Sequence, residues 1–270
     1  MSSPTPAPAP VVSTTTPVVT IPTPTQKVAI CIPTMITVDA RWALNLPKVL
    51  GTAPPNSTFF AEWRYGVAET RESLYHTAMK SVPDLTHVFY YDADIIPITD
   101  FPIQTLLQDN KQIVSGVYWN SLYTGVAAWK DEKPINMAEQ RNSPLIECDK
   151  VGFGMTLISI DVFKTLIEAD EPRPFFKYVI DTKTNSLMSE DFYFLTQLCA
   201  KHGIKPFLDT RVQAMHLKNL GILPNGQVQV DQPPRGDGVS SHGVGRPLHH
   251  DRARPVSGHL ADQRPVGGLP

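Results

Sequence analysis

The chain has 270 residues, of which 41% are hydrophobic, a length that allows one globular domain with tails or two small domains. Its formal net charge is −2 and it shows no basic stripe, which argues against a nucleic-acid partner and against binding to an anionic membrane surface. Because it lacks a run of about eighteen apolar residues, the sequence predicts no transmembrane helix.

Cysteine usage and the N-terminal residues favour a cytoplasmic location. Cys31, Cys148 and Cys199 are widely spaced and lie in apolar segments, which predicts reduced core thiols rather than a disulfide framework or a zinc site. The first residues contain no basic segment followed by an apolar one, so a secretory signal is not expected.

Half of the 26 prolines lie in the two end segments, 1–26 and 231–270, which we expect to be tails. Residues 1–26 form a Pro/Thr-rich tract without a periodic apolar face, as in an extended linker. Residues 231–270 are rich in Gly, Pro, Arg and His and are predicted to be disordered, so metal binding by the His-His-Asp run at 249–251 would be adventitious. One ordered domain is therefore predicted over 27–230.

Between the tails, short apolar runs and helical periodicity follow one another as in an α/β domain. An apolar run at 27–33 without alternation predicts a first strand that is buried on both faces. After a polar, Pro-rich region around 47–57, a strand is expected at 58–63 and a helix at 67–82. A further buried strand would end just before Asp92.

The rest of the domain predicts more elements of the same kind. A short helix at 101–108, capped by Asp100, is followed by a strand at 112–119 and by a polar and mobile excursion at 120–145 around an isolated Trp129. A strand at 155–160 and a helix capped by Asp161 come next, and then a helix from Ser189 that ends at Gly203. The last elements are a strand pair at 205–217 and 227–230, joined across a turn at 224–226.

Two carboxylates, Asp92 and Asp94, follow the buried strand and are separated only by Ala93. The carboxyl end of a central strand is where open α/β sheets bind their ligands. In an extended backbone the two side chains would point the same way and could hold one hard divalent cation. A strand that simply ends in two turn-forming aspartates is the alternative, and the motif alone does not decide between them.

Four other features carry chemistry, each with an ordinary structural explanation beside it. Glu190 and Asp191 lie in the first turn of a helix, where acids also complement the helix dipole. His216 ends an apolar strand, where a histidine often serves packing alone. Arg71 could hold a phosphate or be a solvated charge, and the turn at 152–154 suggests close backbone approach.

Taken together and in this order, these segments resemble the GT-A nucleotide-sugar glycosyltransferases of the family 2 type over about residues 27–220. The resemblance is carried by Ile32-Pro33-Thr34, the Arg71 helix, Phe89 to Asp94, Val114 to Tyr118, Val151 to Gly154, Ser189 to Phe192, and Met215-His216-Leu217. It implies an α/β fold with a mostly parallel central sheet flanked by helices. It also implies metal-dependent transfer of a sugar from a nucleotide-diphosphate sugar to the hydroxyl of a glycan or other acceptor.

The resemblance implies roles for individual residues on the donor side. Asp92 and Asp94, with Ala93 between them, would hold Mn²⁺ or Mg²⁺ on the donor diphosphate, and His216 would supply a further ligand. The cation would stabilise the charge that builds on the departing nucleoside diphosphate, and an imidazole ligand shifts the preference toward Mn²⁺.

The remaining implied roles concern the nucleoside, the donor sugar and the acceptor. Pro33 and Thr34 would border the nucleoside pocket, and Arg71 would reach the ribose or the phosphates. Gly152, Phe153 and Gly154 would let the backbone approach the donor sugar and the acceptor.

Asp191 would act as the general base if the reaction inverts the anomeric centre. Glu190 is the second candidate for that role and could instead contact the acceptor.

Of three other readings, the first and the third stay open. In a haloacid-dehalogenase-type phosphohydrolase Asp92 would be the nucleophile, but that family has Thr or Val where Ile96 stands. Sugar-nucleotide pyrophosphorylases carry a Gly-rich basic loop after the first strand, unlike the segment at 33–36. A non-catalytic nucleotide-sugar-binding relative is the third. The expected disordered tail follows soon after His216, so we expect any C-terminal lid or acceptor element to be short or absent, which leaves the acceptor undefined.

Overall fold

The computed structural model describes residues 26–34, 37–120, 125–140, 143–182, 185–217, 221–222 and 228–229. The expected tails at 1–26 and 231–270 lie outside these residues, apart from Gln26, and so does the turn expected at 224–226.

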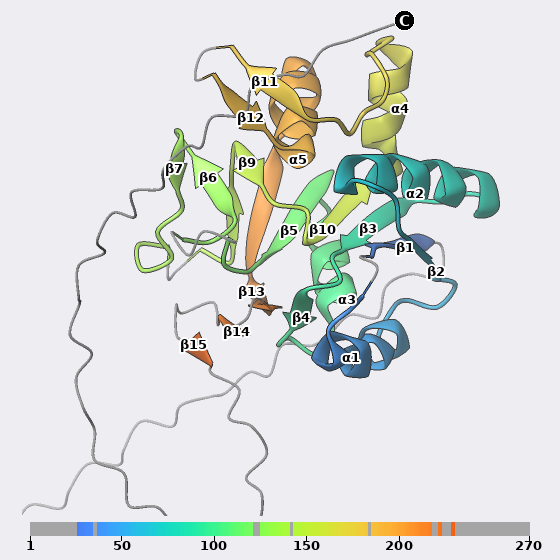
Figure 1. Ribbon diagram of the computed structural model, residues 1–270, viewed down its shortest axis with the longest axis vertical. Helices are drawn as coiled ribbons and strands as arrows, with labels where there is room; N and C mark the ends of the chain where they lie inside the picture. The colour runs from blue at the N-terminus through green and yellow to red at the C-terminus, as the bar shows by residue number, and fades with distance from the viewer. Residues whose placement is uncertain are drawn as a thin grey trace, which may run out of the picture. The chain divides into compact units, whose positions relative to one another are not determined.

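A central sheet organises the fold, in the order β15-β14-β13-β5-β10-β3-β1-β2 (Figure 1). Five of its strands run parallel, and β10 (Met155–Ser159) is antiparallel between β3 and β5. The parallel strands are β2 (Thr58–Glu62), β1 (Val28–Pro33), β3 (His87–Tyr91), β5 (Ile113–Val117) and β13 (Pro206–Leu217). The expected α/β fold with a mostly parallel central sheet is confirmed.

Helices cover both faces of this sheet. The helices α2 (Val67–Ser81), α4 (Ile160–Glu168) and α5 (Glu190–Tyr193) bury side chains in one hydrophobic cluster, together with the π and 3₁₀ turns at 194–202 that continue α5. The helices α1 (Ala40–Gly51) and α3 (Pro102–Gln108) contribute to the other. No helix in the described ranges combines the length and the hydrophobicity that a bilayer-spanning segment needs.

The first strand shows why the apolar runs lack alternation. All six residues of β1 are buried, with Ala29 and Cys31 in one cluster and Ile30 and Ile32 in the other. A strand with helices on both faces needs apolar side chains at every position. The three cysteines, all in described segments, are free and buried, as expected.

The structure corrects two expected helix caps. α3 begins after Phe101, and Asp100 instead forms an ion pair with Lys48 at 2.8 Å. Ser159 is the N-cap of α4, where its side chain accepts a hydrogen bond from the Asp161 backbone N–H at 3.2 Å. A cap must have extended backbone geometry, and the last residue of β10 already has it.

One helix was not anticipated. The region around 47–57 reads as polar and Pro-rich, yet α1 runs through Pro47 to Gly51. Asp39 caps the helix by accepting from the Arg41 backbone N–H at 2.8 Å, and Trp42 is buried beneath it. Tertiary packing of this kind outweighs the cost of one internal proline.

The excursion expected at 120–145 contains ordered strands in its described part. The strands β6 (Ala128–Lys130) and β7 (Lys133–Pro134) form a hairpin that pairs with β9 (Lys150–Val151). Trp129 is not isolated, because its ring meets Phe192 edge to face with centroids 4.9 Å apart. The expectation of an irregular excursion was therefore wrong for these residues.

Short strands complete the domain. β4 (Ile95–Pro97) and β8 (Leu145–Glu147) pair with β13, and β11 (Val179–Asp181) pairs with β12 (Ser186–Met188). β15 (Val228–Gln229) exists as expected but pairs with β14 (Gly221–Ile222) rather than with β13.

A buried carboxylate pair joins α3 to β13. The side chains of Asp109 and Asp209 are only 5% and 0% exposed, and both contact the Arg211 guanidinium. The Nη2 atom of Arg211 is 2.8 Å from Asp209 Oδ2. Burial and the negative charge of Asp209 raise the pKa of Asp109 to about 7.

We expect Asp109 to make the folding stability fall as the pH rises. Its folded pKa of about 7 lies above the value of about 3.9 for an unfolded aspartate, so its contribution is fully present in acid and is lost as the pH rises through about 7. Asp109→Asn removes this loss. Between about pH 6 and pH 8, the free energy of unfolding, measured by urea titration, should fall by about 1 kcal/mol more in the wild type than in the variant.

The matched control is Asp84→Asn, which removes a 90%-exposed carboxylate that pairs with Lys27. It should leave the wild-type dependence of stability on pH unchanged. A wild-type dependence in Asp109→Asn would contradict the raised pKa.

Candidate functional site

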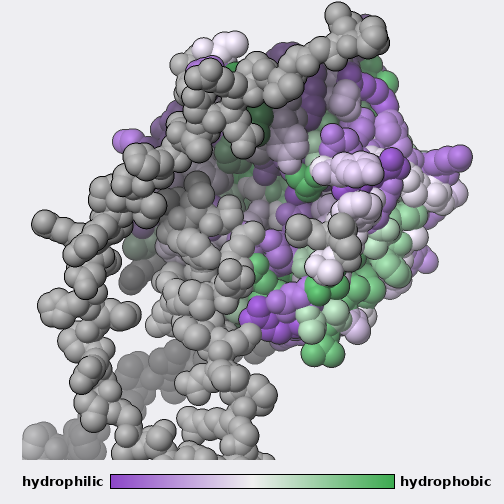
Figure 2. Space-filling view, in the orientation of Figure 1, coloured by the Kyte–Doolittle hydropathy of each residue, from purple (hydrophilic) through white to green (hydrophobic). Residues whose placement is uncertain are grey.

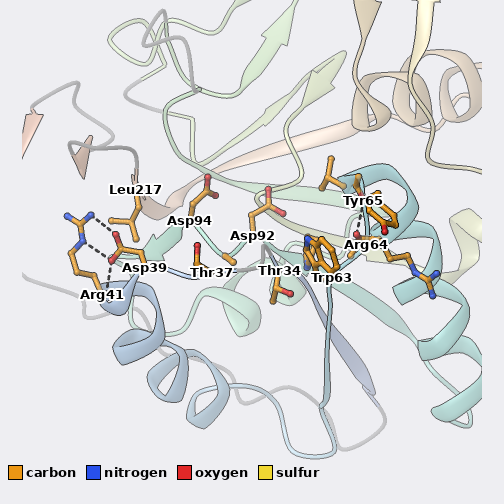
Figure 3. Close-up of a pocket in the computed structure, with 15 residues that line it drawn as sticks. Thr34, Thr37, Asp39, Arg41, Trp63, Arg64, Tyr65, Asp92, Asp94 and Leu217 are labelled. Atoms are coloured by element: carbon orange, nitrogen blue, oxygen red, sulfur yellow. Dashed lines mark hydrogen bonds and ion pairs between the residues drawn. The ribbon is translucent and has the colours of Figure 1, made fainter.

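The two aspartates of the Asp-x-Asp motif line one cavity at the carboxyl ends of β1 and β3 (Figure 3). The cavity has a volume of about 840 Å³. Five residues that the sequence predicted for the donor site line it, namely Pro33, Thr34, Asp92, Ala93 and Asp94. The parallel arrangement of β1 and β3 brings these two segments to the same edge of the sheet.

The backbone of the motif is a turn and not the extended segment that we expected. The Ile95 backbone N–H donates to the Asp92 carbonyl at 3.2 Å, and the chain then enters β4. The Asp92 carbonyl also accepts from Trp42 Nε1 at 3.1 Å. The turn and the α1 tryptophan therefore hold both carboxylates at the cavity in place of an extended strand.

Arg71 lies under the motif as a buried cation with only 2% of its surface exposed. Its Nη2 atom is 2.9 and 3.1 Å from the two oxygens of Asp92, and its Nε atom is 3.1 Å from Glu190 Oε1. Its Nη1 atom donates to the Phe153 carbonyl at 3.3 Å. Arg71 thus joins β3, α5 and the turn at 152–154, and it lies outside the described lining of the cavity.

This network sets the ionisation of Asp92. Burial raises the pKa of Asp92, the Arg71 guanidinium lowers it, and the nearby Asp94 and Glu190 carboxylates raise it. Both oxygens of Asp92 accept from the one Nη2 atom of Arg71, which favours the carboxylate form, but burial outweighs this effect and raises the pKa of Asp92 to about 7.

His216 faces the second aspartate of the motif. Its Nδ1 atom lies 2.7 Å from the Trp119 carbonyl, which can only accept, so Nδ1 carries a proton. Its Nε2 atom is directed at Asp94 Oδ2 at 3.1 Å. A backbone carbonyl that orients one ring nitrogen in this way is typical of histidines whose other nitrogen binds a metal.

The donor atoms suit a hard or borderline cation, but the ligands are not all gathered. Within the described ranges, no three His, Cys, Asp or Glu side chains are grouped closely enough to hold a metal ion as they stand. Asp94 and His216 are in contact, whereas Asp92 is turned to Arg71. Carboxylate oxygens with one imidazole nitrogen fit Mn²⁺ or Mg²⁺ chemically. A site with three ligands requires Asp92 to exchange part of its contact with Arg71 for the cation.

The two acidic residues at the start of α5 have different partners. Glu190 is 4% exposed and contacts Arg71. Asp191 Oδ1 accepts from the Phe192 backbone N–H at 2.8 Å and from the Ser189 hydroxyl. Burial and the Glu190 charge raise the pKa of Asp191 to about 6, while the Ser189 hydrogen bond lowers it. Asp191 lies outside the described lining of the cavity.

The glycines at 152 and 154 face Tyr118. Added β-carbons at Gly152 and Gly154 would lie 2.4 and 2.9 Å from its hydroxyl oxygen. The Gly154 backbone N–H donates to that hydroxyl oxygen at 2.8 Å, and the Gly154 carbonyl accepts from the Asp92 backbone N–H at 2.9 Å. The residues at 152–154 are buried, so the close approach that their glycines permit is to Tyr118.

Other residues of the cavity were not anticipated from the sequence. They come from the start of α1 and from the loop between β2 and α2, and include Asp39, Arg41, Trp63, Arg64 and Tyr65. The signal for the second group was present, because the loop follows a parallel strand at the same sheet edge as the motif. The first group depends on α1, which was itself missed.

Comparison with known proteins finds similarity only at the level of structure. No family model matches the sequence, and no curated protein matches it. The crystal structure of A197 from STIV is similar, with a TM-score of 0.53 and 18% identity, over 81% of this chain and 100% of that one. The likeness is one of fold.

Two further solved structures are more distant. The inositol-1-phosphate CTP transferase from T. maritima has a TM-score of 0.39 and 11% identity, over 72% of this chain and 89% of that one. The nucleoside-diphosphate-sugar pyrophosphorylase from Vibrio cholerae RC9 has a TM-score of 0.35 and 10% identity, over 68% and 91%. Neither likeness is strong enough to bear on function.

Removing the buried cation should cost far more than removing an exposed one. We expect Arg71→Met to destabilise the fold by about 3–5 kcal/mol in urea unfolding, because it leaves buried Glu190 without its counter-ion. The double variant Arg71→Met/Glu190→Gln should recover part of this loss. Arg64→Met, which breaks a half-exposed ion pair with Glu62, is the control and should cost about 1 kcal/mol or less. Equal losses for Arg71 and Arg64 would contradict the proposed burial cost.

Proposed function

We propose that this protein is a metal-dependent glycosyltransferase that moves a sugar from a nucleotide-diphosphate sugar to an acceptor hydroxyl. The observation that carries the proposal is that Asp92 and Asp94 line a cavity of about 840 Å³ and that His216 Nε2 lies 3.1 Å from Asp94 Oδ2. Pockets of this size accommodate ligands of nucleotide size. The resemblance in the order of motifs and the α/β fold support the same proposal.

The cavity offers suitable groups for a nucleotide sugar. Trp63 is 46% exposed and Tyr65 fully exposed, and their rings, 5.7 Å apart, provide apolar faces on which a nucleobase could stack. Pro33 and Thr34 lie beside this segment, because the Thr34 backbone N–H donates to the Glu62 carbonyl at 2.8 Å. Arg64 places a cation at the same opening, where a phosphate group would be favoured.

Asp92, Asp94 and His216 are the residues that would hold Mn²⁺ or Mg²⁺ in this proposal. The bound cation would stabilise the negative charge of the nucleoside diphosphate as it leaves. Arg71 keeps Asp92 in place before binding and remains the counter-ion of Glu190 afterwards. The Trp119 carbonyl holds the imidazole so that Nε2 faces the cation position.

Asp191 is the proposed general base of an inverting transfer. Its Oδ1 atom is held by Ser189 and by the Phe192 backbone, an arrangement that orients Oδ2 as the atom available for a proton. With a pKa of about 6 the side chain is ionised at neutral pH and still basic enough to accept the proton of a hydroxyl as the new bond forms. Glu190, paired with Arg71, is less suited to that role.

The contacts of Asp92 disfavour the phosphohydrolase alternative. A carboxylate that attacks phosphorus needs a free oxygen, and both oxygens of Asp92 accept from Arg71. Hydrolysis assays separate the three classes. A glycosyltransferase should release sugar slowly from a nucleotide sugar, a phosphatase should cleave phosphomonoesters, and a binding relative should do neither.

The donor assignment can be tested with a thermal-shift screen of nucleotides and nucleotide sugars, with and without Mn²⁺, followed by calorimetry. Asp92→Asn/Asp94→Asn should weaken Mn²⁺-dependent binding of the best nucleotide sugar by at least about tenfold, since two carboxylate ligands become neutral amides. The control Asp100→Asn removes an exposed carboxylate paired with Lys48 and should bind as the wild type does. Unchanged Mn²⁺-dependent binding in the double variant would refute the metal assignment.

The base assignment predicts a separation of turnover from donor affinity. Asp191→Asn should lower kcat by about 10²–10⁴-fold and leave the donor Kd unchanged, because the residue acts on the acceptor proton alone. In the wild type, kcat/KM should fall below about pH 6, where the carboxylate with a pKa of about 6 becomes protonated. A variant that keeps wild-type turnover would exclude Asp191 as the base.

A further inference from the structure

A second cavity lies beside the first, between the outer face of α2 and the segment at 174–178. Its volume is about 570 Å³, and we call it the α2 groove. Arg64 lines both cavities. Glu69 lines the groove, and Gly66 lines the first cavity. The two residues are in contact, because a β-carbon added to Gly66 would lie 2.2 Å from Glu69 Oε2. The two cavities are therefore neighbours that share a border.

The groove is built on fixed walls. Glu72 accepts hydrogen bonds from the Phe175 and Phe176 backbone N–H groups at 2.9 and 3.2 Å, which ties the segment at 174–178 to α2. Phe176 is 1% exposed and packs against Phe194 with ring centroids 4.9 Å apart. Preformed walls of this kind are usual in small-molecule sites.

The chemistry of the groove suits an uncharged ligand with many hydroxyl groups. Two cations and two carboxylates balance each other in its lining, namely Arg64, Lys177, Glu69 and Glu72. A strongly anionic ligand would face the carboxylates, and a strongly cationic one would face the cations. Figure 2 shows mainly hydrophilic residues over the region where Figure 1 draws α2.

The groove also offers the hydroxyls of Ser73 and Thr77 and the imidazole of His76. Tyr178, which is 42% exposed, lines the groove, and its ring can provide an apolar face. Polar groups beside an exposed aromatic ring match a sugar, which has hydroxyls at its rim and C–H groups on its faces.

Tyr178 connects the groove to the proposed base. In the hairpin of β11 and β12, Val179 pairs with Met188, so Tyr178 and Ser189 leave the open end of the hairpin side by side. Ser189 directly precedes Glu190 and Asp191. Burial together with the charges of Glu190 and Asp191 raises the pKa of Tyr178 to about 12, as expected for a hydroxyl near those carboxylates.

We propose that the α2 groove is the acceptor site and that its ligand is a neutral saccharide, seated on Tyr178 and hydrogen-bonded by Glu69, Ser73 and His76. This inference rests on the proposed function for the roles of the donor cavity and of Asp191. In the transfer, the bond from the anomeric carbon to the diphosphate oxygen breaks and the nucleoside diphosphate leaves with the electron pair. The acceptor oxygen forms the new bond to that carbon, and its proton passes to Asp191.

The test uses saturation-transfer NMR on the full chain in the presence of Mn²⁺ and a nucleoside diphosphate. The probes are the methyl glycosides of glucose, galactose, mannose and N-acetylglucosamine and their 1,4-linked disaccharides. Tyr178→Ala and the groove-blocking Thr77→Trp, at an exposed position of α2, should each weaken binding of the best probe at least about tenfold. Phe59→Ala, which removes an aromatic ring that is 53% exposed on β2, is the control and should bind as the wild type does.

Nucleotide binding is measured in parallel by calorimetry with Mn²⁺. Saccharide binding that is equal in all variants, or absent for every probe in the wild type, overturns the groove assignment, even when nucleotide binding is intact. Saccharide binding that depends on the groove without any nucleotide binding would support the saccharide site and refute the glycosyltransferase proposal. Wild-type nucleotide binding by Thr77→Trp shows that a loss of saccharide binding is not a loss of folding.

Discussion

One buried guanidinium organises the candidate site. Arg71 reaches from α2 to Asp92 at the end of β3 and to Glu190 at the start of α5, with all three side chains within 3.1 Å of a partner. A buried arginine needs counter-ions, because an unpaired charge in the protein interior is costly. Since the two carboxylates come from elements about a hundred residues apart, their shared cation fixes how the halves of the site face each other.

The two carboxylates of each acidic motif have different surroundings. In each motif one carboxylate is bound to Arg71, and the other has different partners. Asp94 faces His216, and Asp191 is oriented by Ser189 and the backbone. In the proposed function Asp92 joins the two roles, because it is held by Arg71 and would also bind the cation beside Asp94, whereas Glu190 stays with Arg71.

Apolar runs and helical periodicity in the sequence were enough to predict the strands and helices whose burial follows a regular pattern. β1, β3 and α2 are uniformly apolar or clearly periodic, and each was placed within a few residues of its observed bounds. α1 and the hairpin of β6 and β7 were missed, because their stability comes from distant contacts. Trp42 donates to the Asp92 carbonyl, and Trp129 packs on Phe192, partners that no local window contains. For the same reason the aspartates were placed at the correct edge but with the wrong backbone conformation.

Gly152 and Gly154 leave space for the tyrosine that contacts His216. The Tyr118 hydroxyl occupies the volume beside Gly152 and Gly154, and the ring of Tyr118 meets His216 edge to face with centroids 5.8 Å apart. A methyl group at either glycine would overlap the Tyr118 hydroxyl, so the ring that contacts His216 would have to move. The contact between Tyr118 and His216 thus depends on two residues that have no side chain.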